Sequence, residues 1–381
     1  MKTKLFVFWI AAILAYAAPE GGVYADSEGQ SAKVRKSKEK IVVEEVFPAF
    51  PEGVWIHSKP LDEKIFQEKL TLVYFWDYTS INSIREIKLL QLWLEQYRPY
   101  GFQMIWVHAP EYAVSSEEKA VKKMLEKWGI QEPVFLDNQF KLWETLQIKS
   151  WPTKILVNEE GKIIFSQVGE GRFAQMEEKI RSGLLRLDPA SVLPETLFFT
   201  DTDPYNPELC GEMSAETYLG YKRATWWGAK IANRQWVSEN ETLNFKDRGD
   251  REEKGFFAEG LWANREDYLE HARETPELTD YSGIQYVARE VYAVLHHLGA
   301  EAARVYVTRD DRPVPVEFRG IDLQVDGEGE TYLNVQEPRL YYLVKNEDPE
   351  THELKLWPAA KGVAVHSFSF SNSCLADFDH R

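Results

Sequence analysis

Cysteine is scarce in this sequence, with only Cys210 and Cys374 among 381 residues. Two thiols are too few for a disulfide-dense scaffold or for a zinc site built from cysteine alone. Basic residues are also in the minority, with 45 Lys and Arg against 61 Asp and Glu and a formal net charge of -16. Because nucleic-acid binding draws most of its affinity from Lys and Arg, this balance argues against a nucleic-acid partner.

No apolar run reaches the roughly 18 residues that a membrane span requires. The apolar segment from Leu5 to Ala18 follows two lysines and precedes small-residue sites ending at Ala17 and Ala25. This pattern is typical of a secretory signal peptide, and a buried helix or a membrane anchor is the alternative. We therefore expect a signal peptide at 1–25, a polar linker at 26–46, and a protein that acts outside the cytoplasm, either periplasmic or secreted, with no membrane span after cleavage.

The first half of the chain alternates strand and helix patterns, and its apolar content is enough to bury a core. Continuous apolar runs at 72–76 and 102–108 are typical of strands buried on both faces, and apolar spacings of three and four at 84–97 indicate a helix. Further strands are expected at 134–136, 154–158 and 163–168, and further helices at 117–128, 140–146 and 174–185. Ser115 and Glu118 are predicted to form a capping box for the helix at 117–128. Together these elements predict an α/β domain of the thioredoxin plan over residues 47–186.

The second half of the chain has a different sequence pattern. Four prolines mark residues 187–207 as a connector between domains. Beyond it, alternating apolar and polar residues predict strands at 304–308, 321–325, 339–345, 352–357 and 363–370. Many short strands separated by Gly, Pro and Asp clusters predict an all-β sandwich or jelly roll over residues 208–381.

Two segments of the first domain have positions that matter for chemistry: the strand-to-helix junction at 76–83, and Trp151-Pro152-Thr153. In a thioredoxin fold these segments meet, and a cis proline, here Pro152, faces the first turn of the helix. The helix N-terminus stabilises an anion, so a cysteine placed there becomes a thiolate at neutral pH. A second cysteine three residues later resolves the mixed disulfide.

Residues 70 to 185 or so resemble the thioredoxin-like domain of the TlpA/DipZ (redoxin) family of extracytoplasmic thiol oxidoreductases. The matching stretches are 75–83, 107–112, 133–138, 151–153 and 169–171. In DipZ-like proteins the first stretch resembles F-W-T-Y-S-C-I-N-C, whereas this chain has Ser80 and Ser83 where the two cysteines belong. Past the connector, residues 216–220, 338–344 and 364–370 resemble the β-sandwich appended to DipZ-type domains, which looks like a carbohydrate-binding module.

The two serines determine what chemistry the junction allows. A helix terminus lowers a pKa by at most about 1.5 units, so a serine hydroxyl there stays neutral near pH 7. Serine also has no disulfide chemistry. We therefore expect no catalytic residue, metal or cofactor, and a redox-inactive protein that binds a client peptide or protein, or a glycan through the C-terminal domain. The expected binding surface consists of Trp76, Tyr78, Asn82, Trp151 and Pro152.

The alternative function, implied by the resemblance, is a thiol-disulfide oxidoreductase or a peroxide reductase. Such an enzyme would have to use Cys210 and Cys374 or the thiols of a partner protein. In an oxidising compartment the simpler expectation is that these two cysteines form one structural disulfide in the C-terminal domain. A free, reactive pair is the other interpretation.

Several further side chains each have a functional and a structural interpretation. Ser80 is either a hydrolase nucleophile or, with Thr79, a helix N-cap, and no G-x-S-x-G elbow surrounds it. Asp77 is either a buried acid with a raised pKa or a local cap. His108, near Glu111, is expected to be structural.

The C-terminal half offers two more candidates. His296 and His297 are adjacent, so they should point to opposite faces of a strand, with no third ligand at metal spacing. A group of aromatic residues is either a glycan-binding face or part of the core, and core packing is favoured for each ring taken singly. Its members are Trp226, Trp227, Trp236, Trp262, Tyr218 and Tyr221.

Overall fold

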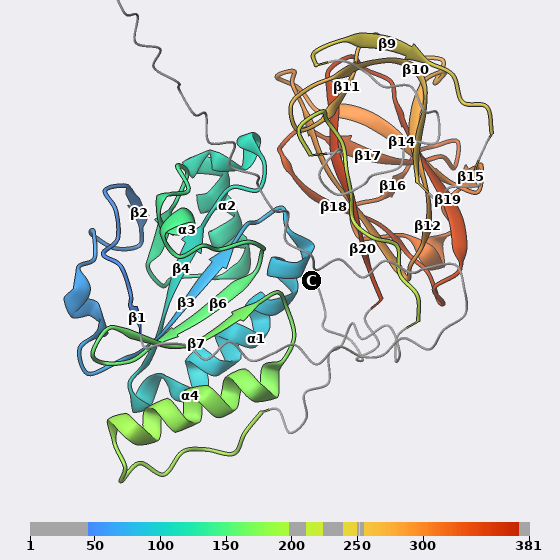
Figure 1. The fold of residues 1–381 in the computed structure, drawn as a ribbon. Coiled ribbons are helices and arrows are strands. Elements are labelled where there is room, and N and C mark those ends of the chain that lie inside the picture. The colour runs from blue at the N-terminus through green and yellow to red at the C-terminus, as the bar shows by residue number, and fades with distance from the viewer. Residues whose placement is uncertain (1–44, 198–210, 224–238, 250, 252–254, 373–381) are drawn as a thin grey trace, which may run out of the picture. The chain divides into compact units, whose positions relative to one another are not determined.

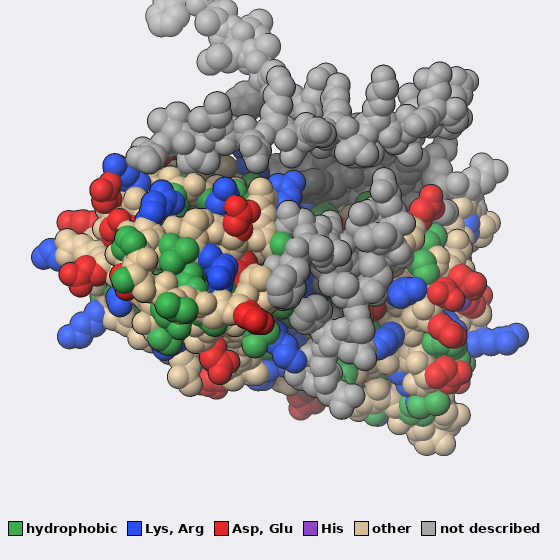
Figure 2. All heavy atoms as spheres, turned by 90° about the horizontal axis from the view of Figure 1, so that it is seen from below, with side chains coloured by type: hydrophobic (Ala, Val, Ile, Leu, Met, Phe, Trp, Pro, Cys, Tyr) green, Lys and Arg blue, Asp and Glu red, His purple; other side chains and the backbone are tan. Residues whose placement is uncertain are grey.

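The computed structural model describes residues 45–197, 211–223, 239–249, 251 and 255–372 (Figure 1). The predicted signal peptide, nearly all of the predicted linker and both cysteines lie outside these ranges. On the face seen in Figure 2, acidic and basic side chains are interspersed over the described surface.

The first domain is a mixed sheet of seven strands flanked by helices. Its strands are β1 Glu45–Val46, β2 Val54–Ile56, β3 Leu70–Trp76, β4 Phe102–His108, β5 Val134–Leu136, β6 Thr153–Val157 and β7 Lys162–Val168. They lie in the order β1-β7-β6-β3-β4-β5-β2. The pairs β3–β4 and β4–β5 are parallel, whereas β6 and β7 run antiparallel to each other and β6 runs antiparallel to β3. This is a thioredoxin-like α/β sheet, as the sequence predicts.

Helices cover both faces of this sheet (Figure 1). The α-helices are α1 Ile81–Tyr97, α2 Glu118–Trp128, α3 Lys141–Thr145 and α4 Phe173–Leu187, and short 3-10 turns are η1 Glu63–Phe66, η2 Arg98–Tyr100 and η3 Ala113–Ser116. Successive side chains of a strand point to opposite faces. Leu72 and Tyr74 of β3 therefore pack in one core with residues of α1, α2 and α4, while Val73 and Phe75 pack in a second core with Leu142 of α3.

The predicted capping box at the start of α2 is wrong. Glu117 is the N-cap residue of this helix, and it makes no side-chain capping hydrogen bond. The Ser115 hydroxyl belongs to the preceding turn η3 instead, where it lies within hydrogen-bond distance of the Tyr112 carbonyl and of the Asp77 carboxylate. A buried carboxylate that lies far away in the sequence competes successfully for this hydroxyl, which local sequence spacing does not reveal.

The second domain consists of antiparallel strands that enclose one core. Its strands are β8 Thr217–Tyr218, β9 Thr242–Phe245, β10 Phe256–Asn264, β11 Leu269–His271, β12 Tyr281–Val287, β13 Glu290–His297, β14 Ala303–Arg309, β15 Arg312–Pro313, β16 Gln324–Val325, β17 Thr331–Val335, β18 Arg339–Lys345, β19 Thr351–Pro358 and β20 Val363–Ser371, with the 3-10 turn η4 Val316–Phe318. The strand order is β16-β17-β14-β19-β12-β10-β11-β20-β13-β18, with β15 beside β14, β8 beside β20 and β9 beside β10. This all-β architecture matches the predicted sandwich.

Strand β10 belongs to both layers of the sandwich. Its first part, 256–259, pairs with β12, and its second part, from Gly260 onward, pairs with β9 and β11. Gly260 has a φ of +93°, and a Cβ there would lie 2.0 Å from Cγ of Asp280. Only glycine fits where the strand passes from one layer to the other.

One predicted strand is shorter than expected. Of residues 321–325 only Gln324–Val325 (β16) is extended in a ladder. Upstream, the Leu323 amide donates to the Gly320 carbonyl in a turn. The Asp322 carboxylate accepts from the Tyr342 amide and from Arg339. These contacts hold Asp322 outside the strand although the apolar–polar alternation continues through it.

A cavity-forming substitution in β3 tests the packing of the first domain. Leu72→Ala removes a fully buried side chain from the centre of the sheet, and we expect it to lower the free energy of unfolding by about 2–5 kcal/mol. Denaturant unfolding followed by circular dichroism measures this loss. Leu92→Ala on α1 is the control, because that side chain is 40% exposed. A loss as large for Leu92→Ala as for Leu72→Ala would contradict the assignment of the core.

Candidate functional site

The site begins where β3 ends and α1 starts. Asp77 follows the strand, and its carboxylate accepts hydrogen bonds from the main-chain amide and the hydroxyl of Thr79, closing a tight turn. Ser80 then occupies the N-cap position of α1 in an extended conformation, but its side chain makes no capping bond. Asp77 therefore combines the two roles considered for it. It caps the turn locally, and burial raises the pKa of its carboxyl group.

The same carboxylate holds a second loop in place. The other oxygen of Asp77 accepts from the Glu111 amide at 2.6 Å and from the Ser115 hydroxyl at 2.6 Å. The loop after β4 is also tied to the proline loop, because the indole N–H of Trp151 donates to the Ala109 carbonyl at 2.8 Å. The Trp151–Pro152 peptide bond is cis. Asp77 and Trp151 therefore gather three loops at the N-terminus of α1.

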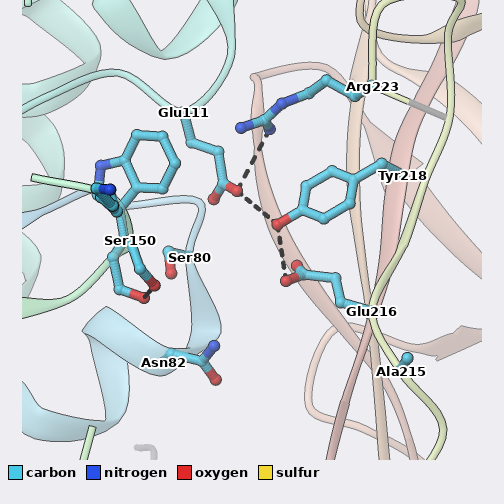
Figure 3. Close-up of a pocket in the computed structure, with 10 residues that line it drawn as sticks. Ser80, Asn82, Glu111, Ser150, Ala215, Glu216, Tyr218 and Arg223 are labelled. Carbon is cyan, nitrogen blue, oxygen red and sulfur yellow. Dashed lines mark hydrogen bonds and ion pairs between the residues drawn. The ribbon is translucent and has the colours of Figure 1, made fainter. Parts of the chain in front are cut away.

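A pocket of about 290 Å³ opens at this point (Figure 3). The first domain lines it with Ser80, Asn82, Glu111, Lys149, Ser150 and Trp151, and the chain from 211 onward lines it with Ala215, Glu216, Tyr218 and Arg223. Tyr218 and Arg223 come close enough to contact Glu111 directly. The pocket is therefore built from both halves of the chain.

Charged and polar groups on one wall of the pocket contact one another directly. The Tyr218 hydroxyl lies 2.8 Å from a carboxylate oxygen of Glu111 and 2.8 Å from one of Glu216, and the Arg223 guanidinium lies 3.3 Å from Glu111 (Figure 3). The Ser369 hydroxyl donates to the second oxygen of Glu216 at 2.6 Å. Burial, reinforced by the charge of Glu111, raises the pKa of Glu216 to about 7. Burial also raises the pKa of Glu111.

Further contacts join the loop after β4 to the C-terminal domain. The Tyr112 hydroxyl donates to the Ser367 hydroxyl at 2.8 Å, and the Ala113 amide donates to the Asp267 carboxylate at 3.0 Å. The Tyr112 ring also packs edge-on against His366, with ring centroids 4.8 Å apart. Residues 111–113 are thus a principal point of contact between the two halves of the described chain.

Three of the five residues predicted to form the binding surface are buried. Trp76 and Tyr78 are 0% and 1% exposed and pack in the core of the first domain, so they cannot present a surface to a ligand. Pro152 is buried as well, whereas Asn82 and Trp151 are half-buried and line the pocket. Alternate side chains of β3 point to the face of the sheet that α1 covers. Trp76 is one of them, so its ring packs beneath the helix and not at a surface.

The two predicted serines lie one helical turn apart and differ in environment. Ser80 lines the pocket and is 6% exposed. Ser83 is fully buried, and its hydroxyl has no hydrogen-bond partner among the described residues. Sequence reasoning missed Lys149, Glu216 and Arg223, and it considered Tyr218 only as a packing or sugar-stacking ring. No local motif identifies them, because their proximity to Ser80 depends on the contact between the two halves.

His108 is a buried structural residue. It ends β4 with no exposed surface, and its ring stacks on Tyr78 with centroids 5.5 Å apart. Neither ring nitrogen has a hydrogen-bond partner in the described part of the chain; the nearest carboxylate oxygen, from Asp77, is 3.6 Å from Nε2. Burial lowers the pKa of His108 to about 3, so the ring is neutral at physiological pH.

The two adjacent histidines of β13 face opposite sides, as predicted. His296 is buried and its Nδ1 lies 2.9 Å from Nε2 of His366, while His297 contacts the Glu301 and Lys361 carbonyls. Across the described residues, no group of three or more His, Cys, Asp or Glu side chains is arranged to hold a metal ion. Nor is any described helix long and apolar enough to cross a membrane.

Three of the aromatic residues considered for a glycan-binding face lie among the described residues, and these three are buried or half-buried. Trp262 is fully buried in the sandwich core and its indole N–H donates to the Glu259 carbonyl. Tyr218 is buried at the pocket, and Tyr221 is half-buried. Trp226, Trp227 and Trp236 lie outside the described residues.

Comparison with known proteins places this architecture among thioredoxin-related chains. Residues 214–371 match a family model described as "Thioredoxin like C-terminal domain". "Protein DipZ" of Mycobacterium tuberculosis is 26% identical over 320 residues, which cover 83% of this chain and 41% of DipZ. This chain is related to DipZ over most of its length.

Two further comparisons cover less of the chain. "Protein SUPPRESSOR OF QUENCHING 1, chloroplastic" of Arabidopsis thaliana is 27% identical over 163 residues, covering 41% of this chain and 16% of that protein. A putative thioredoxin from Neisseria meningitidis, solved in solution, is 23% identical with a TM-score of 0.34 and covers 38% of this chain and 92% of its own. This chain spans about two fifths of the length of the DipZ proteins that it matches.

The buried His108 predicts a specific pH dependence of stability. Its pKa is about 3 in the folded chain against 6.5 ordinarily. Between these two pH values the unfolded chain binds more protons than the folded chain, so the free energy of unfolding decreases as the pH is lowered. At pH 5 this costs the wild type about 2 kcal/mol relative to pH 8. In His108→Phe this cost is absent. The free energy of unfolding of the variant relative to wild type should therefore be about 2 kcal/mol more favourable at pH 5 than at pH 8. An equal difference at both pH values, in urea titrations, would show that His108 titrates normally.

Proposed function

We propose that this protein binds an extended peptide or protein segment in the pocket at the N-terminus of α1, outside the cytoplasm, and that it performs no thiol–disulfide exchange there. The observation that carries this proposal is the presence of hydroxyls, not thiols, at positions 80 and 83. These two residues begin α1 at the spacing of a thioredoxin dithiol, and Ser80 faces the pocket (Figure 3).

Because positions 80 and 83 carry oxygen and not sulfur, no redox reaction can occur there. The electrostatic effect of the helix N-terminus does not depend on these side chains and is kept. The amides at the start of α1 favour a partial negative charge, such as a carbonyl oxygen, whatever the side chain is. A serine hydroxyl donates and accepts hydrogen bonds but forms no covalent bond to a substrate sulfur. No cysteine occurs at any position from 45 to 197 that would take over the role.

Groups that suit an extended chain surround the two serines. The Ser80 hydroxyl has no hydrogen-bond partner among the described residues, and neither does the main-chain amide of Trp151 beside the cis proline. An incoming main chain supplies alternating carbonyls and amides that pair with such groups. The location outside the cytoplasm rests on the apolar segment Leu5 to Ala18 and its flanking lysines.

The alternative activity is that of a thiol–disulfide oxidoreductase, as the name of one relative suggests: "Thiol-disulfide oxidoreductase ResA" of Bacillus anthracis is 22% identical over 194 residues. In this chain that activity would have to use Cys210 and Cys374, both outside the described residues. The pocket at α1 contains no sulfur, which favours binding over exchange.

Insulin reduction separates these two functions. The full chain without its signal segment should show no turnover above background with dithiothreitol as reductant, because no dithiol lies at α1. The double variant Ser80→Cys/Ser83→Cys should gain turnover, since the helix N-terminus lowers the thiol pKa. Both measurements are repeated with Cys210→Ala/Cys374→Ala. Turnover by the wild type that this second pair of changes abolishes would overturn the proposal.

Blocking the pocket tests the binding function. Ser80→Trp places a bulky ring in the cavity and should reduce binding of a cysteine-alkylated, permanently unfolded polypeptide at least tenfold in fluorescence anisotropy. Ser182→Trp, on the exposed face of α4, is the matched control and should bind like wild type. If the Ser80→Trp variant keeps wild-type affinity and a native thermal unfolding profile, the ligand does not occupy this pocket.

A further inference from the structure

One wall of the pocket is formed by Glu111, Tyr218 and Glu216, and we call it the acidic wall. It has fewer donor hydrogens than its short oxygen–oxygen contacts require. The Tyr218 hydroxyl lies 2.8 Å from Glu111 Oε1 and 2.8 Å from Glu216 Oε2. A phenol has one hydrogen, so it can donate to only one of these two acceptors at a time. The other short oxygen–oxygen contact needs a hydrogen from elsewhere: either a proton held by one carboxylate or a donor that enters the pocket.

Among the described residues, no cationic side chain forms a direct ion pair with Glu216, although the charge of Arg223 lowers its pKa. Arg223 pairs with Glu111 at 3.3 Å and lies over the rings of Tyr112 and Tyr218, with its guanidinium carbon 5.0 and 4.6 Å from their centroids. The group nearest to Glu216 from strand β20 is the neutral Ser369 hydroxyl. No Lys or Arg among the described residues forms an ion pair with Glu216. The remaining cation of the lining, Lys149, is exposed and forms no ion pair with the other described residues.

An unsatisfied donor lies on the other side of the same cavity. Ser80 is 94% buried by its 6% exposure, lines the pocket and has no hydrogen-bond partner in the described chain. In Figure 3 Ser80 and Asn82 lie across from the chain of groups formed by Glu111, Tyr218 and Glu216. The cavity therefore offers a donor for a carbonyl oxygen at one end and two acceptors for a cationic donor at the other.

We propose that the pocket receives the ammonium group of a lysine side chain from the bound peptide, and that this group replaces the proton that Glu111 and Glu216 otherwise share. This inference rests on the proposed peptide-binding function and specifies its ligand. An ammonium group carries three N–H donors and a positive charge. It supplies the hydrogen that the Glu111–Tyr218–Glu216 chain lacks and forms an ion pair with Glu216, which Arg223 does not. The peptide carbonyl nearby accepts from Ser80.

Competition with a proton makes binding depend on pH. The pKa of Glu216 in the empty pocket is about 7 because of burial and the nearby charge of Glu111. At pH 6 about nine tenths of the sites hold the proton, and at pH 8 about one tenth do. The affinity for a lysine peptide should therefore increase about tenfold from pH 6 to pH 8. The titratable and charged groups around the site are Glu111, Tyr218, Arg223, Tyr112 and Lys149.

Two matched peptide libraries test the ligand. Both have blocked ends, one fixed central position and randomised neutral flanks; the central residue is lysine in one and Nε-acetyl-lysine in the other. With the full chain at pH 8, the lysine library should bind at least tenfold more tightly, measured by fluorescence anisotropy. At pH 6 this advantage should shrink to about twofold or less.

A variant and its control assign the effect to Glu216. Glu216→Gln keeps the shape but removes the charge and the titration, so it should abolish both the lysine preference and the pH dependence. Glu212→Gln, at an exposed position outside the lining, should change neither. Wild-type calorimetry in two buffers of different ionisation enthalpy gives a second measurement that needs no variant: about half a proton should be released per lysine peptide bound at pH 7.

Each outcome bears on one proposal or on both. Equal affinity for the two libraries at pH 8, or no proton release, overturns the lysine assignment and leaves peptide binding intact. Absence of binding by either library at every pH, together with absence of binding to the unfolded polypeptide, overturns the proposed function itself. A lysine preference that persists unchanged in Glu216→Gln shows that the ammonium group binds elsewhere.

Discussion

The site depends on one buried carboxylate, that of Asp77. It accepts hydrogen bonds from Thr79 on its own turn and from Glu111 and Ser115 on the loop after β4. Four donors directed at one carboxylate offset much of the cost of burying it. Because these bonds join the start of α1 to the loop that carries Glu111, they set the spacing between Ser80 and the acidic wall. The contacts with Tyr218 and Arg223 are built on Glu111.

In the proposed function, serine at positions 80 and 83 separates two properties that a thioredoxin dithiol junction combines. The helix N-terminus and the cis-proline loop provide a docking place, and a dithiol provides the reaction. In this chain Ser80 and Trp151 line a pocket beside the cis proline, whereas no atom at positions 80 and 83 could carry out the exchange. The C-terminal domain contributes charged groups to the same cavity, so both halves of the chain line it.

Periodicity predicted the central strands of the first domain well because β3, β4, β5 and β6 are buried on both faces, whereas the short outer strands β1 and β2 were not predicted. β4 and β5 occupy the predicted residues, and β3, β6 and β7 differ by two residues or fewer at either end. Prediction was weaker where a side chain far away in the sequence intervenes. Ser115 binds Asp77 instead of capping α2, and Asp322 holds its segment out of a strand. Trp76 and Tyr78 were expected at a surface, but the pleat of β3 and the turn after it place both rings in the core.

Composition and local pattern alone were sufficient to establish that no thiol stands at the helix start and that a thioredoxin-like sheet precedes an all-β domain, because both follow from residue identity and short-range periodicity. The contacts of Glu111 with Tyr218 and Arg223 join positions up to 112 residues apart. Such contacts depend on how the folded halves meet. The same holds for the raised pKa of Glu216 and for the two contacts that the Tyr218 hydroxyl makes with carboxylates. Desolvation and proximity create these properties, and neither exists until the chain has folded.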